Sequence, residues 1–176
     1  MNIRKANKSD EESIRQIHLK TFGDDEKELV ANLACELLRE SSSPNSIHLV
    51  AEAESYLVGH IAFSPIHSKT KGNLIGYILA PLAVLPSHER KGIGKKLIEE
   101  GFKELASRKV EVILVYGDPK FYSRFGFKPE PAEKYLPPFE LKYPFGWQAI
   151  DNRAINPAKQ PEPIQCVSAL NKPELW

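Results

Sequence analysis

PSHERKGIGKK, residues 86–96, joins the most apolar run of the chain, LIGYILAPLAVL at residues 74–85, to an amphipathic helix. Glycines at positions 92 and 94 let the backbone turn tightly and bring N–H groups close to a ligand. Positive charge surrounds this turn on Arg90, Lys91, Lys95 and Lys96. Apolar or small residues then follow at helical spacing, namely Leu97, Ile98, Gly101, Phe102 and Leu105. Because the N-terminus of a helix favours an anion, the sequence predicts a turn that binds the pyrophosphate of a nucleotide-like cofactor.

The segments on either side of this turn read as neighbouring strands. Residues 74–85 are apolar on both faces, as in a central strand, and residues 110–116 alternate between apolar and polar. A right-handed crossover would lay the two strands parallel. Pro81 cannot donate a hydrogen bond to the sheet, so we expect a bulge or a local splay there. A short helical piece over residues 120–125 should end at Gly126.

The N-terminal part of the chain predicts an edge strand, two helices and a hairpin. Residues 2–6 read as the strand, and Ser9 with Glu12 makes a capping box that should start the first helix. The apolar stripe of a second helix runs to about Glu40. Two strands at residues 47–52 and 57–63 then form a hairpin.

The C-terminal part is rich in proline and aromatic residues. Nine of the 14 prolines lie beyond Phe127, and a last strand is expected at residues 164–167. Aromatic side chains in this part are expected to cap the sheet edge; they are Tyr135, Phe139, Tyr143, Phe145 and Trp147. We expect one domain over residues 1–150 and a C-terminal extension, residues 151–176, packed on it.

Composition excludes several classes of protein. With 24 Lys and Arg against 23 acidic residues, the net charge of +1 gives no case for nucleic acid or a membrane as partner. Cys35 and Cys166 are far apart and form no CxxC pattern, so neither a disulfide framework nor a metal site is expected. The N-terminus lacks the apolar segment of a signal peptide. We therefore expect a cytoplasmic protein, either a monomer or a homodimer.

Two common phosphate-binding turns do not fit residues 86–96. A P-loop requires Ser or Thr after its GK pair, whereas Lys95 is followed by Lys96 and Leu97. A dinucleotide-binding fingerprint requires a third glycine where Leu97 stands.

Two ordered blocks resemble the GNAT superfamily of N-acetyltransferases. The family places Q/R-x-x-G-x-G/A between a central strand and a helix, and residues 89–94, ERKGIG, occupy that position here. A second block at residues 121–127, FYSRFGF, is similar to the later FYxxxGF signature of the family. The resemblance spans about residues 1–128. Glu89 departs from the family pattern, which usually has Gln or Arg there, so the backbone amides would carry the binding.

This resemblance implies an α/β fold of the acyl-CoA N-acyltransferase type. Its central mixed sheet would be mostly antiparallel, flanked by helices, with a splayed pair of parallel strands. The co-substrate would be acetyl-CoA, without a metal. The pyrophosphate would lie on the turn formed by Glu89, Arg90, Lys91, Gly92, Ile93, Gly94 and Lys95. The pantetheine arm would pair with the end of the preceding strand at Leu82, Ala83 and Val84.

The resemblance also implies a catalytic role for Tyr122. Its counterpart in the family donates a proton or hydrogen bond to the departing thiolate, and a phenol with a pKa of about 10 is a donor at neutral pH. The attacking amine needs a base or a water chain, and the candidates remain open. They are Glu52, His60, His67, His88 and Asp118.

The function implied is transfer of an acetyl group from acetyl-CoA directly to a primary amine of a small molecule or protein. No cysteine lies near the two blocks, so no acyl-enzyme is indicated. The alternative is a non-catalytic sensor or assembly module that binds acetyl-CoA with the same fold.

Overall fold

The computed structural model describes residues 1–153 and 160–176. Residues 154–159, part of the expected C-terminal extension, lie outside the described residues. The chain divides into two compact units that alternate along the sequence: Met1–Phe63 with Ala80–Arg108, and Ser64–Leu79 with Lys109–Trp176. The expected boundary at residue 150 stays a prediction.

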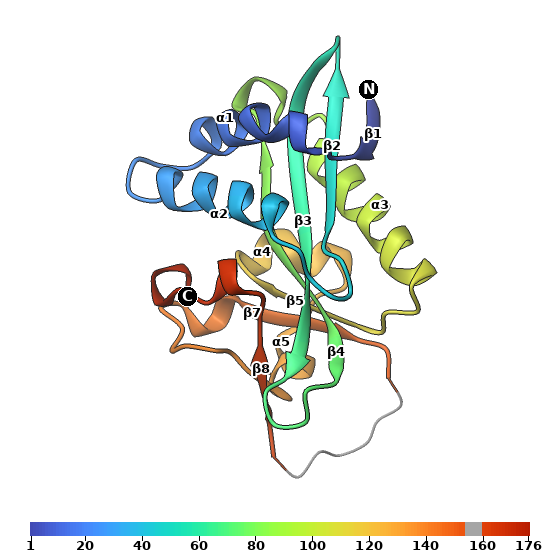
Figure 1. Cartoon of the computed structure of the whole chain (residues 1–176), viewed down its shortest axis with the longest axis vertical. Coiled ribbons are helices and arrows are strands. Elements are labelled where there is room, and N and C mark those ends of the chain that lie inside the picture. Colours follow the sequence, from blue (N-terminus) through green and yellow to red (C-terminus); the bar gives the residue numbers. More distant parts are fainter. Residues whose placement is uncertain (154–159) are drawn as a thin grey trace. The chain divides into compact units, whose positions relative to one another are not determined.

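Strands and helices follow one another much as expected (Figure 1). Up to the end of the turn's helix they are β1 (Asn2–Lys5), α1 (Glu11–Thr21), α2 (Lys27–Arg39), β2 (Ile47–Ala53), β3 (Tyr56–Ser68), β4 (Leu74–Val84) and α3 (Ile93–Ser107). Beyond it they are β5 (Val112–Tyr116), α4 (Pro119–Tyr122), α5 (Pro129–Ala132), β6 (Tyr135–Leu136), β7 (Trp147–Asp151) and β8 (Glu162–Gln165).

The strands form a mixed sheet in the order β1-β2-β3-β4-β5-β7. The pairs β1–β2, β2–β3, β3–β8 and β5–β7 are antiparallel, whereas β4–β5 and β6–β8 are parallel. The mixed sheet with flanking helices confirms the expected fold class.

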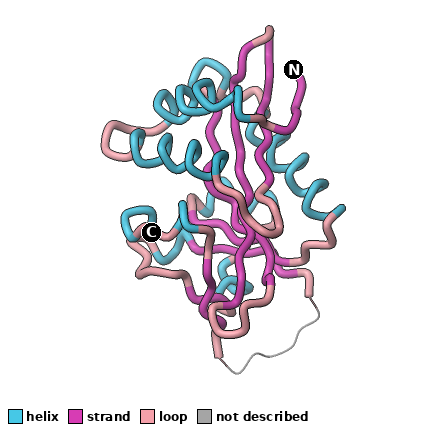
Figure 2. The backbone as a smooth tube through the Cα atoms, viewed as in Figure 1, coloured by secondary structure: helices cyan, strands magenta, loops and turns pink. Residues whose placement is uncertain are grey.

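Helices of the first unit cover both faces of its strands (Figures 1 and 2). Val50 of β2 packs against Ile14 of α1 and Ala34 of α2. Val50 lies opposite His60 of β3, so α1 and α2 cover the face to which His60 points. Because neighbouring residues of a strand point to opposite faces, Gly59 belongs to the other face of the sheet, and that face lies against Leu97 of α3.

Glycine allows α3 to approach β3 closely. A Cβ at Gly101 would stand 2.2 Å from Cε2 of Phe63, a fully buried side chain of β3. The ring therefore occupies the space that any side chain at position 101 would need. The predicted apolar face of the helix is confirmed by Leu97, Ile98 and Leu105, which are buried.

The capping box that starts the first helix lies two residues earlier than expected. The predicted pair, Ser9 and Glu12, does not form it. Instead Oδ1 of Asn7 accepts the Ser9 N–H at 2.9 Å, and the Asn7 N–H donates to Oδ2 of Asp10 at 2.8 Å. The prediction was wrong because the chain first makes a 3-10 turn at residues 8–10, which moves the unsatisfied amides toward the N-terminus.

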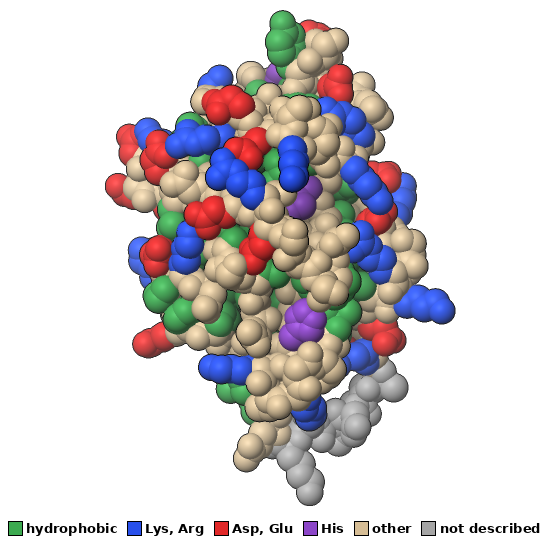
Figure 3. All heavy atoms as spheres, in the orientation of Figure 1, with side chains coloured by type: hydrophobic (Ala, Val, Ile, Leu, Met, Phe, Trp, Pro, Cys, Tyr) green, Lys and Arg blue, Asp and Glu red, His purple; other side chains and the backbone are tan. Residues whose placement is uncertain are grey.

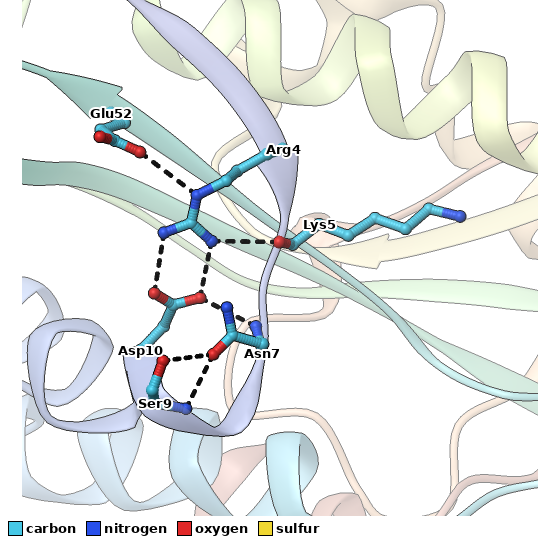
Figure 4. Close-up of polar contacts among 6 residues, drawn as sticks. All are labelled: Arg4, Lys5, Asn7, Ser9, Asp10 and Glu52. Carbon is cyan, nitrogen blue, oxygen red and sulfur yellow. Dashed lines mark hydrogen bonds and ion pairs between the residues drawn. The ribbon is translucent and has the colours of Figure 1, made fainter.

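Asp10 of this box also ties the first strand to the first helix (Figure 4). The guanidinium of Arg4 donates to both carboxylate oxygens of Asp10, at 2.8 and 2.9 Å, and to Glu52 of β2 at 3.2 Å. The Arg4 guanidinium therefore holds the pKa of the Asp10 carboxyl below its usual range.

In the second unit, β5 lies between β4 and β7. Residues 77–79 of β4 pair in parallel with residues 113–115 of β5, as the crossover predicts. Pro81 lies inside β4 without ending it, and the predicted splay there stays a prediction. The sequence did not predict β7, which pairs antiparallel with the whole of β5. The last strand, β8, begins two residues before the expected position.

The described residues include no helix long and apolar enough to cross a membrane. Basic and acidic side chains are interspersed on the face drawn in Figure 3, in keeping with the net charge of +1.

Candidate functional site

The glycine turn before α3 depends on left-handed backbone at two positions. Arg90 has φ 59° and Gly92 has φ 75°, and α3 begins at Ile93. Nothing lies within 4 Å of a Cβ built at Gly92, so its glycine is required by conformation and not by crowding among the described residues. Gly94 differs from the expectation, because it lies in the first turn of α3 without a positive φ.

The backbone amides of this turn are free donors. Among the described residues, none of the six amides from Arg90 to Lys95 donates a hydrogen bond to a backbone carbonyl. The first such bond runs from the Lys96 N–H to the Gly92 carbonyl, at 3.0 Å. No side chain caps the helix at Gly92. The turn therefore presents consecutive N–H groups at the positive end of a 15-residue helix.

The basic side chains around the turn are exposed, as is Glu89. The Lys91 Nζ donates to the Ser87 carbonyl at 3.1 Å, and Lys95 forms a loose ion pair with Glu99 at 3.7 Å. These contacts leave the charge of Lys91 unneutralised. The electrostatics thus favour an anion here.

Residues 82–84 end β4 just before the turn. Ala83 is buried, and its carbonyl lies 3.3 Å from the position that a Cβ on Gly59 would take. The Val84 carbonyl accepts a hydrogen bond from the Thr21 hydroxyl of α1, at 3.0 Å. Leu82 is partly buried. The end of β4 is therefore fixed against β3 and α1.

Tyr122 ends α4 in the second unit, and Asp118 caps the start of that helix. The Tyr122 ring lies over Gly117, where a Cβ would stand 2.5 Å from Cε2 of the ring. Phe121 and Phe127 pack edge to face on it, with centroids at 5.0 and 5.8 Å. Packing therefore fixes the direction of the phenol.

The Tyr122 hydroxyl remains free to act as a donor. It forms no hydrogen bond within the described residues. Burial, and then the nearby carboxylate of Asp118, raises the pKa of the Tyr122 phenol. The group is therefore protonated at neutral pH.

Two acidic candidates for the base already have structural partners. Glu52 accepts from Arg4 at 3.2 Å. Oδ1 of Asp118 accepts the Lys120 N–H at 2.9 Å, which caps α4.

The three histidine candidates differ in their surroundings. His67 lies near the end of β3, opposite Gln165 of β8. His88 lies in the 3-10 turn before the glycines, with its Nδ1 2.9 Å from the Ser87 hydroxyl. His60 is fully buried. His67 and His88 are only partly buried, so His60 is the one of these three candidates that lies inside the core.

The C-terminal aromatic residues separate into two groups. Tyr135 and Trp147 are buried, and the Trp147 Nε1–H donates to the Tyr135 carbonyl at 3.0 Å. Tyr143 and Phe145 are 48% and 69% exposed. The last two lie at the 3-10 turn before β7, and the expectation that these aromatics cap the sheet edge stays a prediction.

The cysteines and acidic residues provide neither a nucleophile nor a metal site in the part of the chain that the structure describes. No group of three or more His, Cys, Asp or Glu side chains could hold a metal there. Burial raises the pKa of the Cys35 thiol and raises that of Cys166 to about 12. Both thiols are thus protonated and poor nucleophiles at neutral pH.

These features define an α/β protein with free backbone amides at the start of a helix. A family model described as Acetyltransferase (GNAT) domain matches residues 44–129. A protein of Escherichia coli K12 named uncharacterized N-acetyltransferase YjhQ is 34% identical over 135 residues, 75% of this chain and 72% of that protein. Another named YhbS, from the same strain, is 34% identical over 85 residues, 47% of this chain and 50% of that protein.

Solved structures agree with these relatives. A GNAT family acetyltransferase from Brucella melitensis, in complex with acetyl-CoA, has a TM-score of 0.68 and 28% identity, covering 96% of both chains. The Escherichia coli YhbS structure, in complex with CoA, has a TM-score of 0.79 at 23% identity, covering 97% of this chain and 92% of that one, and so supports the fold. The chain belongs to the GNAT family of acetyltransferases.

Proposed function

We propose that the chain transfers an acetyl group from acetyl-CoA directly to a primary amine of a small molecule or a protein. The observation that carries this proposal is the run of six free amides from Arg90 to Lys95 at the start of α3. Such a run suits the clustered oxygens of a pyrophosphate. The acetyl-CoA bound to the related Brucella protein supports the choice of co-substrate.

Each group of residues would have a separate role in binding or in the transfer. The amides and the charges of Arg90, Lys91 and Lys95 would hold the pyrophosphate. The backbone of Leu82, Ala83 and Val84 would pair with the pantetheine arm, and an amide there would polarise the thioester carbonyl. Tyr122 would donate to the thiolate as it leaves. The role of Tyr122 rests on the family motif and on its free hydroxyl.

Replacement of Gly92 by Leu tests the binding turn. Gly72 is a matched control, because its φ of 74° is nearly that of Gly92 and nothing lies within 4 Å of its Cβ position either. Both replacements force a side chain into left-handed backbone, at a cost of about 1–2 kcal/mol each. Acetyl-CoA at about 100 times its Kd should stabilise wild type and Gly72→Leu by about 2.7 kcal/mol, and Gly92→Leu far less.

Thermal unfolding with and without acetyl-CoA measures this difference. If Gly92→Leu keeps the full stabilisation, the pyrophosphate does not bind at this turn.

Replacement of Tyr122 by Phe tests the chemistry separately from binding. The variant should bind acetyl-CoA as wild type does, while kcat falls by about 10²- to 10⁴-fold, as for loss of a general acid. Release of free thiol in the presence of an amine library measures turnover, and Tyr143→Phe removes an exposed hydroxyl as control. Acetyl-CoA binding without thiol release by wild type on any amine would favour the non-catalytic alternative.

A further inference from the structure

The two peptide groups that flank Val84 direct both of its polar backbone groups away from β3. The Leu85 N–H donates to the Val58 carbonyl of β3, at 2.9 Å. The peptide between Val84 and Leu85 is trans, so the Val84 carbonyl points in the opposite direction, away from β3. The Ala83 carbonyl lies on the β3 side, 3.3 Å from the Cβ position of Gly59, and the peptide that follows it is also trans. The Val84 N–H therefore points away from β3 as well.

Within the described residues, no strand pairs with Val84 on the side that these two groups face. Strand β4 lies between β3 and β5 in the sheet, and its pairing with β5 covers residues 77–79. Val84 is the last residue of β4. Its N–H and its carbonyl thus provide one donor and one acceptor on the same edge. An extended chain with amide groups can pair with such an edge as a further strand would.

A hydroxyl of α1 holds the Val84 carbonyl in place. Thr21 is the last residue of α1, and its Oγ1 lies 3.0 Å from the Val84 carbonyl oxygen. The same Oγ1 lies 2.7 Å from the Ile17 carbonyl oxygen, one helical turn earlier. The contact with Ile17 stays within the helix and holds Thr21 in the rotamer that also reaches Val84. The contact with Val84 joins α1 to β4.

The Thr21 contact leaves Val84 able to bind a ligand. A carbonyl oxygen has two lone pairs, so one remains for an N–H group of a ligand. The Val84 N–H belongs to the preceding peptide, and Thr21 does not engage it, because its hydroxyl contacts the carbonyl oxygen. Both residues are partly buried, so the core does not enclose them.

Neither the helix nor the strand needs this hydrogen bond to satisfy its backbone. Helix α1 ends at Phe22, whose N–H donates to the His18 carbonyl at 3.1 Å without the Thr21 hydroxyl. The carbonyl of a partly buried residue such as Val84 can accept from water at little cost. The bond from Thr21 therefore adds order to the end of β4 and not a missing partner.

We propose that Thr21 is a positioning residue for the pantetheine arm, and that Val84 is the residue of β4 with which this arm pairs. The inference rests on the proposed use of acetyl-CoA, because that co-substrate supplies the arm. Thr21 acts through the Val84 peptide and does not touch the reacting atoms. Since the direction of the carbonyl is fixed before the arm binds, less free energy is lost in ordering the strand end on binding.

Replacement of Thr21 by Val and, separately, by Ser tests this role. Thr21→Val removes the hydroxyl and keeps a branched side chain, whereas Thr21→Ser keeps the hydroxyl. Calorimetric titration with CoA and with ADP separates the two parts of the co-substrate, because ADP carries a pyrophosphate without the arm. We expect Thr21→Val to bind CoA about three- to tenfold more weakly than wild type, as for the loss of one hydrogen bond, with unchanged affinity for ADP. Thr21→Ser should bind both ligands as wild type does.

Thr70→Val is the matched control. The Thr70 hydroxyl also donates to a specific acceptor, Oε1 of Glu162 at 2.6 Å, but it lies in the second unit. This variant should keep the wild-type affinity for both ligands. A lower melting temperature of Thr21→Val with unchanged affinity for CoA would mean a purely structural role and would overturn the proposal.

Two other results would also overturn the role of Thr21. One is equal weakening of CoA and ADP in Thr21→Val, and the other is equal weakening of CoA in Thr21→Val and Thr21→Ser. The second comparison decides even where ADP binds too weakly to titrate. These affinities do not depend on turnover, so wild type that binds CoA but acetylates no amine would refute the proposed transfer and leave the role of Thr21 to be decided by the same titrations. Wild type that binds no CoA would refute both.

Discussion

Acid should destabilise the first unit through His18 and His60, which are buried, and His48, which is partly buried. The pKa values of His18, His48 and His60 are lowered in the folded protein, from 6.5 to about 3 for His18 and to about 4 for His48. A group with a lowered folded pKa contributes its full stability above the unfolded pKa, and that stability is lost as the pH falls toward the folded pKa. The loss should therefore begin near pH 6.5 and continue to about pH 4 for His48 and about pH 3 for His18.

The size of the effect follows from proton linkage. Each ring that stays neutral in the folded state, but binds a proton when unfolded, lowers the free energy of unfolding by about 1.4 kcal/mol per pH unit. Because the unfolded ring is only half protonated at pH 6.5, integration between pH 6.5 and pH 5 gives about 1.7 kcal/mol for one ring and about 5 kcal/mol for all three, a large part of the stability of an ordinary domain. Carboxyl groups such as Asp10, whose pKa is lowered by Arg4, add little in this pH range.

Urea unfolding followed by circular dichroism at pH 7, 6 and 5 measures the effect. In His60→Gln the slope of unfolding free energy against pH should be smaller than in wild type, by an amount that approaches about 1.4 kcal/mol per pH unit near pH 5. Equal stability of wild type at pH 7 and pH 5 would show that burial does not hold the histidines neutral.

Two further predictions concern packing and the start of the first helix. Gly101→Ala should lower the free energy of unfolding by about 1–3 kcal/mol, because the new Cβ would overlap the buried Phe63 ring. Gly23→Ala is the control, because nothing lies within 4 Å of a Cβ at that position. Equal stability of the two variants in urea unfolding would contradict this prediction. Asp10→Asn should lower the free energy of unfolding by about 1–3 kcal/mol, because the Arg4 guanidinium and the Asn7 amide both lose a carboxylate partner. A change below about 0.5 kcal/mol in the same assay would show that the Arg4–Asp10 ion pair contributes little to stability.

Local sequence patterns were sufficient for most of the fold and for the turn. The hairpin between β2 and β3, the apolar strand β4 and the amphipathic helix α3 all follow from periodicity within a few residues. The two-residue hairpin turn has left-handed backbone at Glu54 and Ser55. Strand β7 was missed because its five residues carry no periodic pattern, and it exists through pairing with β5.

For the candidate site, too, the sequence indicated only the residues that lie in local motifs. The glycine turn and Tyr122 were singled out from sequence because each lies in a compact motif. His18 and His48 were not singled out, because they lie 42 and 12 residues from His60 and only folding brings them together. The predicted capping box of Ser9 and Glu12 failed because a 3-10 turn at residues 8–10 precedes the first helix and takes its cap from Asn7 and Asp10.

The sequence by itself determined that a glycine turn rich in basic residues starts a helix after an apolar strand. That information is local, because φ preference, helical spacing and charge depend on adjacent residues. Only the tertiary structure decided which N–H groups of the turn remain free, and which polar side chains meet in the core. Those contacts depend on the packing of α1, β2 and β3 against one another, and burial then fixes the protonation of the three histidines.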